Sequence, residues 1–98
     1  MLHLKEPWNI PVNSDALETE LDRELHPSSH LYKFKGQFKA VAKNESNDDV
    51  IFEVREMGYA LVHLTWSKND PSVNYPRCKM LAKVKDAQAV IDSDHEFN

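Results

Sequence analysis

The sequence predicts a two-layer α+β fold, in which a three- to four-stranded antiparallel meander sheet follows an N-terminal amphipathic helix and precedes a short C-terminal helix. Two observations lead to this prediction. Leucines recur every four residues between positions 14 and 26, which indicates one helix face, whereas apolar and polar residues alternate in several later segments, which indicates strands. Short polar turns separate the alternating segments, so strands that are neighbours in sequence are expected to pair antiparallel.

The chain is expected to form a single domain over residues 1–98, because its length and its 41% hydrophobic content are typical of one globular unit. Residues 1–12 contain Pro7 and Pro11 on either side of Trp8. Proline favours an extended backbone at its own position and at the preceding residue. We therefore expect an extended arm over 1–12, pinned by Trp8, and an α+β core over 13–98.

The first helix is expected over 14–26, with Asn13 or Ser14 as the N-cap and Pro27 at its end. Its stripe of core-facing residues consists of Leu17, Leu21 and Leu25. A second, shorter helix is expected over 85–92, where apolar residues again recur at helical spacing.

Strands are expected over 37–43, 49–55 and 59–66, with a fourth over 77–83. The alternation places Phe38, Ala40 and Ala42 on one face of the first strand. The segment 59–66 is apolar on both faces, so we expect it to lie inside the sheet rather than at an edge. Residues 44–48 are a turn by composition, and Gly58 is free to adopt positive φ in the next connection.

Composition excludes several classes of protein. Sixteen acidic residues against twelve basic ones give a net charge of −4, which argues against nucleic-acid binding because such binding depends on Lys and Arg neutralising phosphates. No apolar run approaches the roughly 20 residues that cross a bilayer. The first residues lack the pattern of a secretory signal, and the single cysteine, Cys78, allows no internal disulfide. We therefore expect a cytoplasmic protein without a membrane partner.

The acidic first helix is the main functional indication. With the leucine stripe in the core, Asp15, Glu18 and Asp22 are expected to face water, with Glu20 and Glu24 beside them. Like charges at i,i+4 cost a few tenths of a kcal/mol per pair, so the cluster suggests a purpose such as docking on a basic protein. Further contacts are expected from the turn 45–49 and from the loop 67–76. The expected partner-binding residues are Asp15, Glu18, Asp22, Glu45, Asp48, Asp49, Asp70 and Tyr75.

No catalytic residue, metal ligand or cofactor site is predicted. His63, in the middle of the 59–66 strand, is compatible with a general base that has Thr65 on the same face and a carboxylate across the sheet. The alternative, which we favour, is a half-buried structural histidine. No partner residue at a fixed spacing supports the catalytic interpretation.

A zinc site is also not predicted. Four potential ligands are present in His26, His30, Cys78 and His95, but they lack the spacing of known zinc frameworks, and Pro27 interrupts any helix through the first two. We expect exposed loop histidines, and a small buried apolar role for Cys78.

The run Asp48–Val54 (DDVIFEV), followed by Tyr59–Ser67 (YALVHLTWS), resembles small bacterial proteins of unassigned function. In size, charge and layout the chain is also similar to immunity proteins, which neutralise toxins. This similarity implies a non-enzymatic inhibitor that binds a basic toxin directly, such as a nuclease. Two other functions remain open: a small hydrolase or nuclease that uses His63, and a housekeeping protein-interaction module.

Overall fold

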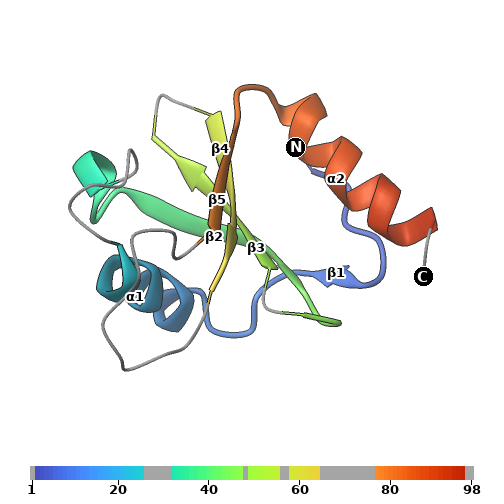
Figure 1. The fold of residues 1–98 in the computed structure, drawn as a ribbon. Helices are drawn as coiled ribbons and strands as arrows, with labels where there is room; N and C mark the ends of the chain where they lie inside the picture. Colours follow the sequence, from blue (N-terminus) through green and yellow to red (C-terminus); the bar gives the residue numbers. More distant parts are fainter. Residues whose placement is uncertain (1, 26–31, 48, 56–57, 65–76, 97–98) are drawn as a thin grey trace.

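The computed structural model describes residues 2–25, 32–47, 49–55, 58–64 and 77–96. In this part of the chain five strands form one antiparallel sheet in the order β1-β2-β3-β4-β5 (Figure 1). The elements in chain order are β1 (Trp8–Asn9), α1 (Ser14–Glu24), the 3-10 helix η1 (Tyr32–Phe34), β2 (Phe38–Asn44), β3 (Asp49–Val54), β4 (Gly58–His63), β5 (Arg77–Leu81) and α2 (Val84–Glu96). The predicted α+β meander is confirmed, with one strand more than expected.

The extra strand, β1, lies in the segment predicted as an extended arm. It pairs with β2 through Trp8–Asn44 and Asn9–Lys43. A two-residue strand is too short to show alternation, so the sequence pattern could not reveal it. The expected fourth strand is present as β5, and the C-terminal helix extends beyond the predicted 85–92 to Glu96.

Helix α1 begins as expected, with Asn13 as its N-cap. The Asn13 side chain accepts a hydrogen bond of 3.1 Å from the backbone N–H of Ala16. The helix ends at Glu24, with Leu25 as C-cap. All three leucines of the predicted stripe are buried against the sheet.

The two helices lie on opposite faces of the sheet, so the molecule has three layers rather than the two expected from the sequence (Figure 1). The α1 face packs Leu21 in one cluster with Phe52 and Val62, whereas the α2 face packs Ile91 in one cluster with Ile51. Strand β4 lies between β3 and β5 and contributes to both clusters, which confirms its predicted internal position.

A β-bulge in β2 changes which face its later residues occupy. The register with β3 shifts between Ala40, which pairs with Phe52, and Ala42, which pairs with Ile51. As a result Ala40 packs on the α1 side and Ala42 on the α2 side, so the predicted common face of Phe38, Ala40 and Ala42 was wrong for the third residue. Beyond the bulge the side chain of Asn44 contacts Asp94 of α2.

Gly58 begins β4 with φ of +105°, in agreement with the expected positive φ. A Cβ atom at this position would lie 2.7 Å from the backbone oxygens of Leu81 and Ala82, so glycine allows β5 to approach closely. In the described part of the chain, no helix has the length and apolar composition needed to span a bilayer.

Candidate functional site

The acidic residues in the middle of α1 are bound to the protein's own backbone. A carboxylate oxygen of Glu18 accepts a hydrogen bond of 2.9 Å from the N–H of Ala40, on the outer edge of β2. A carboxylate oxygen of Asp22 accepts one of 3.1 Å from the N–H of Gly36. Both side chains are half-buried. They therefore secure the helix against the sheet edge and the loop before β2, a role that the expectation of a solvated acidic face did not include.

Glu20 and Glu24 were expected to face water, and this expectation was wrong. Only 8% of Glu20 and 3% of Glu24 is exposed. Arg23 binds both: its Nε donates to Glu20 at 3.0 Å, its Nη2 forms a short ion pair with the same carboxylate, and its Nη2 lies 3.9 Å from Glu24. The sequence shows Arg23 as the only base in the helix, but not that one guanidinium serves two buried acids.

The electrostatics of this cluster favour the ionised form of Glu20. Burial by itself raises the pKa of the Glu20 carboxyl, but hydrogen bonds with Arg23 and Glu24 and the positive charge of Arg23 outweigh burial, so the pKa of Glu20 is lowered from 4.5. The hydrogen bond with Glu20 correspondingly raises the pKa of Arg23. The cluster is thus a stabilising ion pair, and its acids are not free for a partner.

Two predicted acids, Asp15 and Glu45, are exposed. Asp15 is in the first turn of α1, and Glu45 follows the last residue of β2. A shallow groove of about 280 Å³ separates these two elements. Its lining residues are Val12, Asn13, Ala16, Leu17, Lys43 and Glu45. The fold therefore brings the first turn of α1, which contains Asp15, to the groove that Glu45 lines.

Exposed apolar side chains lie at this groove and next to it in the chain. Val12, which lines the groove, is 102% exposed, and Ile10, on the other side of Pro11, is 77% exposed. Lys43, on the groove wall, donates its ammonium group to the backbone oxygen of Asn44 at 3.3 Å. We call the set Val12, Asn13, Asp15, Ala16, Lys43 and Glu45 the end surface. It combines an exposed apolar centre with acids at its rim.

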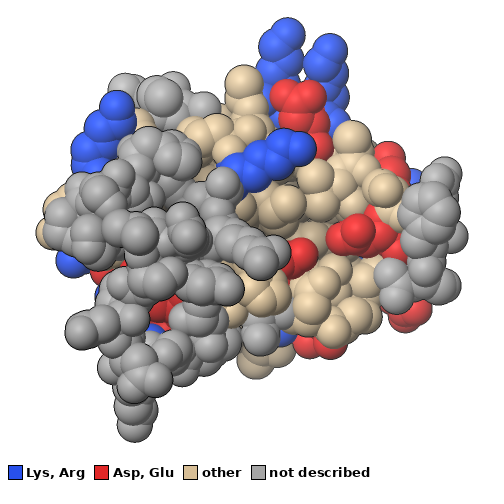
Figure 2. Space-filling model, viewed as in Figure 1, with Lys and Arg blue, Asp and Glu red and all other residues tan. Residues whose placement is uncertain are grey.

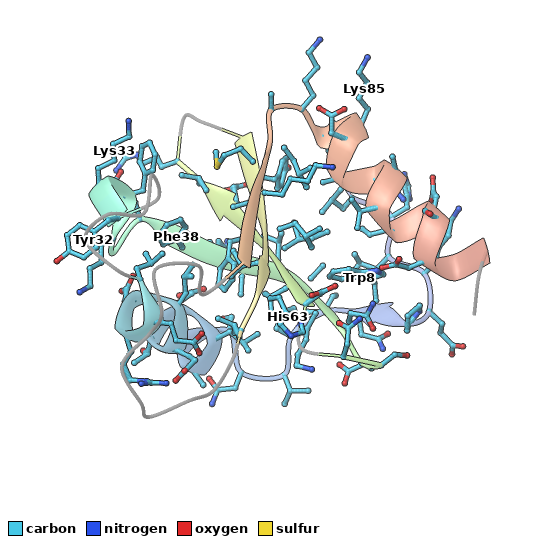
Figure 3. All side chains as sticks on the ribbon, viewed as in Figure 1. Trp8, Tyr32, Lys33, Phe38, His63 and Lys85 are labelled. Atoms are coloured by element: carbon cyan, nitrogen blue, oxygen red, sulfur yellow. The ribbon has the colours of Figure 1, made fainter. Side chains whose placement is uncertain are left out.

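Of the other predicted partner-binding residues, Asp49 is half-buried in β3, and Asp48, Asp70 and Tyr75 lie outside the described residues. Charges are unevenly distributed on the face of the molecule that Figure 2 shows. Most of the Asp and Glu side chains visible in Figure 2 lie on the half of the molecule with β1 and α2, whereas long Lys side chains project beside η1 and beside the start of α2, where Figure 3 labels Lys33 and Lys85.

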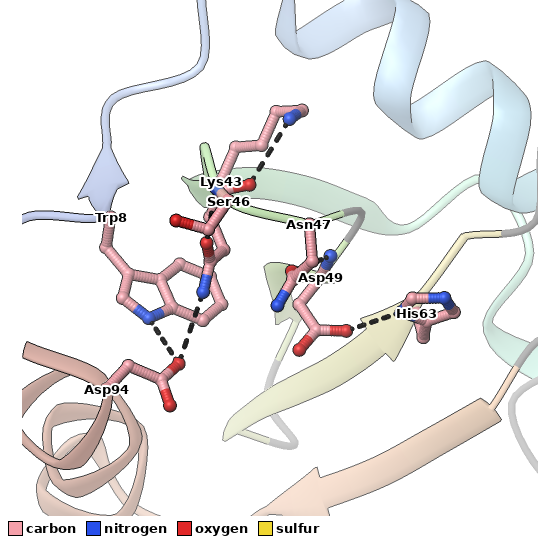
Figure 4. A network of polar contacts seen from close by, with 8 residues as sticks. Trp8, Lys43, Ser46, Asn47, Asp49, His63 and Asp94 are labelled. Carbon is pink, nitrogen blue, oxygen red and sulfur yellow. Dashed lines mark hydrogen bonds and ion pairs between the residues drawn. The ribbon is translucent and has the colours of Figure 1, made fainter. Parts of the chain in front are cut away.

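His63 forms a close pair with Asp49. The two residues are directly opposite in the β3–β4 ladder, and His63 Nδ1 lies 2.8 Å from Asp49 Oδ1 (Figure 4). The histidine side chain is 43% exposed, and Asp49 is itself fixed by a hydrogen bond from its N–H to the side chain of Asn47. The expected carboxylate across the sheet is therefore present. Thr65, the other expected neighbour, lies outside the described residues.

A second polar network, between β1, β2 and α2, was not found by sequence reasoning. Asp94 Oδ2 accepts hydrogen bonds from Trp8 Nε1 at 2.8 Å and from Asn44 Nδ2 at 3.3 Å (Figure 4). The side chain of Trp8 lies between β1 and α2 (Figure 3) and, like Asn44, is buried. These partners are far apart in the sequence and share no motif. The only sequence signal was the isolated tryptophan between two prolines.

Within the described ranges, no three His, Cys, Asp or Glu side chains are placed to hold a metal ion. His26 and His30 lie outside those ranges, as do the side chains of Cys78 and His95, so the arrangement of the four potential zinc ligands is not described.

Comparison of the chain with profiles of protein families, with curated proteins and with solved structures finds no match.

Proposed function

We propose that this chain is a small acidic binding protein of the immunity or antitoxin type, which neutralises a basic protein, such as a nuclease toxin, by direct contact. The observation that supports this proposal most strongly is the end surface, where the exposed Val12 and the exposed acid Glu45 line one groove, and the exposed Asp15 is next in sequence to Ala16 of the same groove.

An apolar centre with a polar rim is the usual composition of a protein–protein interface. Val12, a large apolar side chain that remains exposed, gains free energy when a partner covers it. The two acids of the end surface, Asp15 and Glu45, outnumber its one base, Lys43, so its net negative charge favours a partner with positive charge and increases the rate of association. Nuclease toxins carry such charge because they must bind phosphates.

The proposed contact lies at a different place from the acidic helix face that the sequence suggested. Glu18 and Asp22 are occupied with backbone groups, so a partner that bound them would have to compete with hydrogen bonds that stabilise the fold. Among the hydrogen bonds and ion pairs of the described residues, none involves the side-chain carboxylate of Asp15 or Glu45. The proposed partner contact therefore lies on the first turn of α1 and the turn after β2, and no longer on the middle of the helix.

Capture from a lysate of the source cell tests the proposal. The immobilised chain is expected to retain a basic protein, to release it in about 1 M salt, where the Debye length is only about 3 Å, and to inhibit its activity when added in free form. Val12→Ser is expected to weaken binding about five- to tenfold, as for a central apolar contact.

Val84→Ser provides the matched control, because Val84 is an exposed valine at the start of α2, away from the end surface. It is expected to leave binding unchanged. Equal affinities of the two variants, or a captured protein whose activity the chain does not alter, would contradict the proposal.

The His63–Asp49 pair favours a second candidate, a small hydrolase or nuclease with His63 as general base. A carboxylate at Nδ1 holds the imidazole so that Nε2 can accept a proton from water or a hydroxyl group. Turnover of nucleic-acid or ester substrates by the purified chain, lost in His63→Ala and reduced in Asp49→Asn, would establish this candidate and reject the first. Absence of turnover in the wild-type chain rejects the second.

A further inference from the structure

The N-terminal arm, residues 2–9, is held by a groove between α2 and the sheet that contacts it at successive positions. The side-chain amide of Gln88 accepts a hydrogen bond from the backbone N–H of His3 at 2.7 Å and donates one to its backbone oxygen at 2.8 Å. One side chain thus satisfies both backbone groups of one residue, as a neighbouring strand would. This contact does not depend on the arm's side chain at that position.

Two further contacts on α2 do depend on the arm's side chains. Lys5 forms an ion pair of 3.0 Å with Asp92, and the Trp8 indole donates to Asp94. Apolar contacts complete the set, because Leu2 and Leu4 pack against the cluster that contains Ile91. Going along the chain, residues 3, 5 and 8 of the arm therefore contact residues 88, 92 and 94 of α2, respectively.

The connection from the arm to the core is short and exposed. Residues 10–13 join β1 to α1, with Ile10 and Val12 exposed around Pro11, whose fixed φ favours an extended path. Each polar contact described above joins the arm to a residue more than 80 positions away in sequence, on α2. The arm also pairs with β2 through Trp8–Asn44 and Asn9–Lys43, which are again distant in sequence. Both sets of contacts can therefore form with the α2 and β2 of another molecule without changing either surface.

We propose that this groove also takes the arm of a second copy of the chain, so that two copies exchange residues 2–9 and form a dimer. The partner is a second copy because the groove matches this chain's own sequence in charge at Asp92 and in hydrogen bonding at Asp94. Exchange preserves every arm contact, and its net cost is the entropy of association and any strain in residues 10–13.

A charge exchange between full-length chains tests the proposal. In Lys5→Glu the arm repels Asp92, and in Asp92→Lys the groove repels Lys5, so each variant is weakened on its own. In a mixture, an exchanged heterodimer places the introduced glutamate against the introduced lysine in one groove and the native Lys5 against the native Asp92 in the other. Both pairs are then attractive. Random pairing of equal amounts would already give twice as much heterodimer as homodimer of either variant. We expect native mass spectrometry to show about threefold more heterodimer than this random ratio, or on the order of sixfold more than either homodimer.

The double variant Lys5→Glu/Asp92→Lys controls for folding, since its own arm and groove are again complementary. It is expected to match the wild-type chain in its near-ultraviolet circular dichroism and in its concentration-dependent dimer fraction. A wild-type chain that stays monomeric at all concentrations, or a mixture of the two single variants with no heterodimer, overturns the proposal.

Discussion

The indole Nε1 of Trp8 donates a hydrogen bond of 2.8 Å to Oδ2 of Asp94, which lies 86 residues later in the chain. This contact joins the first strand of the sheet to the last helix and closes the α2 face. Asn44 donates to the same oxygen, so one carboxylate links β1, β2 and α2. Helix α2 is therefore joined to both β1 and β2 by hydrogen bonds to the carboxylate of Asp94.

Replacing Trp8 with phenylalanine is expected to lower the free energy of unfolding by about 1.5–3 kcal/mol, the usual contribution of a hydrogen bond to a charged group. The change keeps an aromatic ring but removes the N–H donor. Denaturation in urea measures the difference. Trp8→Phe in an Asp94→Asn background is expected to cost less, because the acceptor is then uncharged. An equal cost in both backgrounds would show that the loss comes from packing alone.

Glu18 is expected to protect the outer edge of β2. In Glu18→Ala the backbone N–H of Ala40 loses its acceptor, so its hydrogen exchange should accelerate and the free energy of unfolding should fall by about 1 kcal/mol. Glu18→Gln keeps an acceptor oxygen and should preserve most of the protection. Asp15→Ala, at an exposed position of the same helix, should change stability by less than about 0.5 kcal/mol. Unchanged exchange at Ala40 in Glu18→Ala would refute the assigned contact.

The Glu20–Arg23 pair is expected to make stability depend on pH. Because the pKa of Glu20 is lower in the folded state than its ordinary 4.5, its contribution is fully present at neutral pH and is lost as pH falls below 4.5 and through the folded-state pKa. The difference in unfolding free energy between the wild-type chain and Glu20→Gln should therefore shrink with acidification. In an Arg23→Gln background this pH dependence should be weaker. A difference that stays constant from neutral pH to well below 4.5 would argue against the pairing.

The two glycines with positive φ are expected to differ in their tolerance of substitution. Gly36 has φ of +84° and no atom within 4 Å of the position that a Cβ would take, so Gly36→Ala should cost only the backbone strain of about 1–2 kcal/mol. Gly58→Ala carries similar strain and in addition brings its Cβ to 2.7 Å from the backbone oxygens of Leu81 and Ala82. Thermal unfolding should rank Gly58→Ala as clearly less stable. Equal midpoints for the two variants would mean that β5 can move away freely.

The sequence was sufficient to predict the α+β class, the helix α1 and three long strands, because the leucine spacing and the alternation of apolar residues are local signals. It was not sufficient for the layer arrangement. Nothing in the 84–96 segment specifies which face of the sheet that helix covers. The bulge between Ala40 and Ala42 also has no signal in the local pattern, yet it decides which face of the sheet Ala42 occupies.

The candidate site was predicted only in part. Charge count correctly drew attention to Asp15 and Glu45 as exposed acids, but it could not separate them from acids that bind backbone N–H groups or Arg23. The contacts with backbone N–H groups form because the edge of β2 and the loop at Gly36 lie next to α1 in the folded chain. Similarly, the sequence could not identify which carboxylate lies opposite His63. The register of β3 and β4 shows that it belongs to Asp49.

Association kinetics with the captured partner test the central claim most directly. Glu45→Lys and Glu53→Lys change the net charge equally, and both residues are exposed, but only Glu45 belongs to the end surface. We expect the Glu45→Lys variant to associate on the order of tenfold more slowly than the Glu53→Lys variant at low salt, with the gap closing as salt rises. Identical association rates for the two variants would contradict a role for the end surface in partner binding.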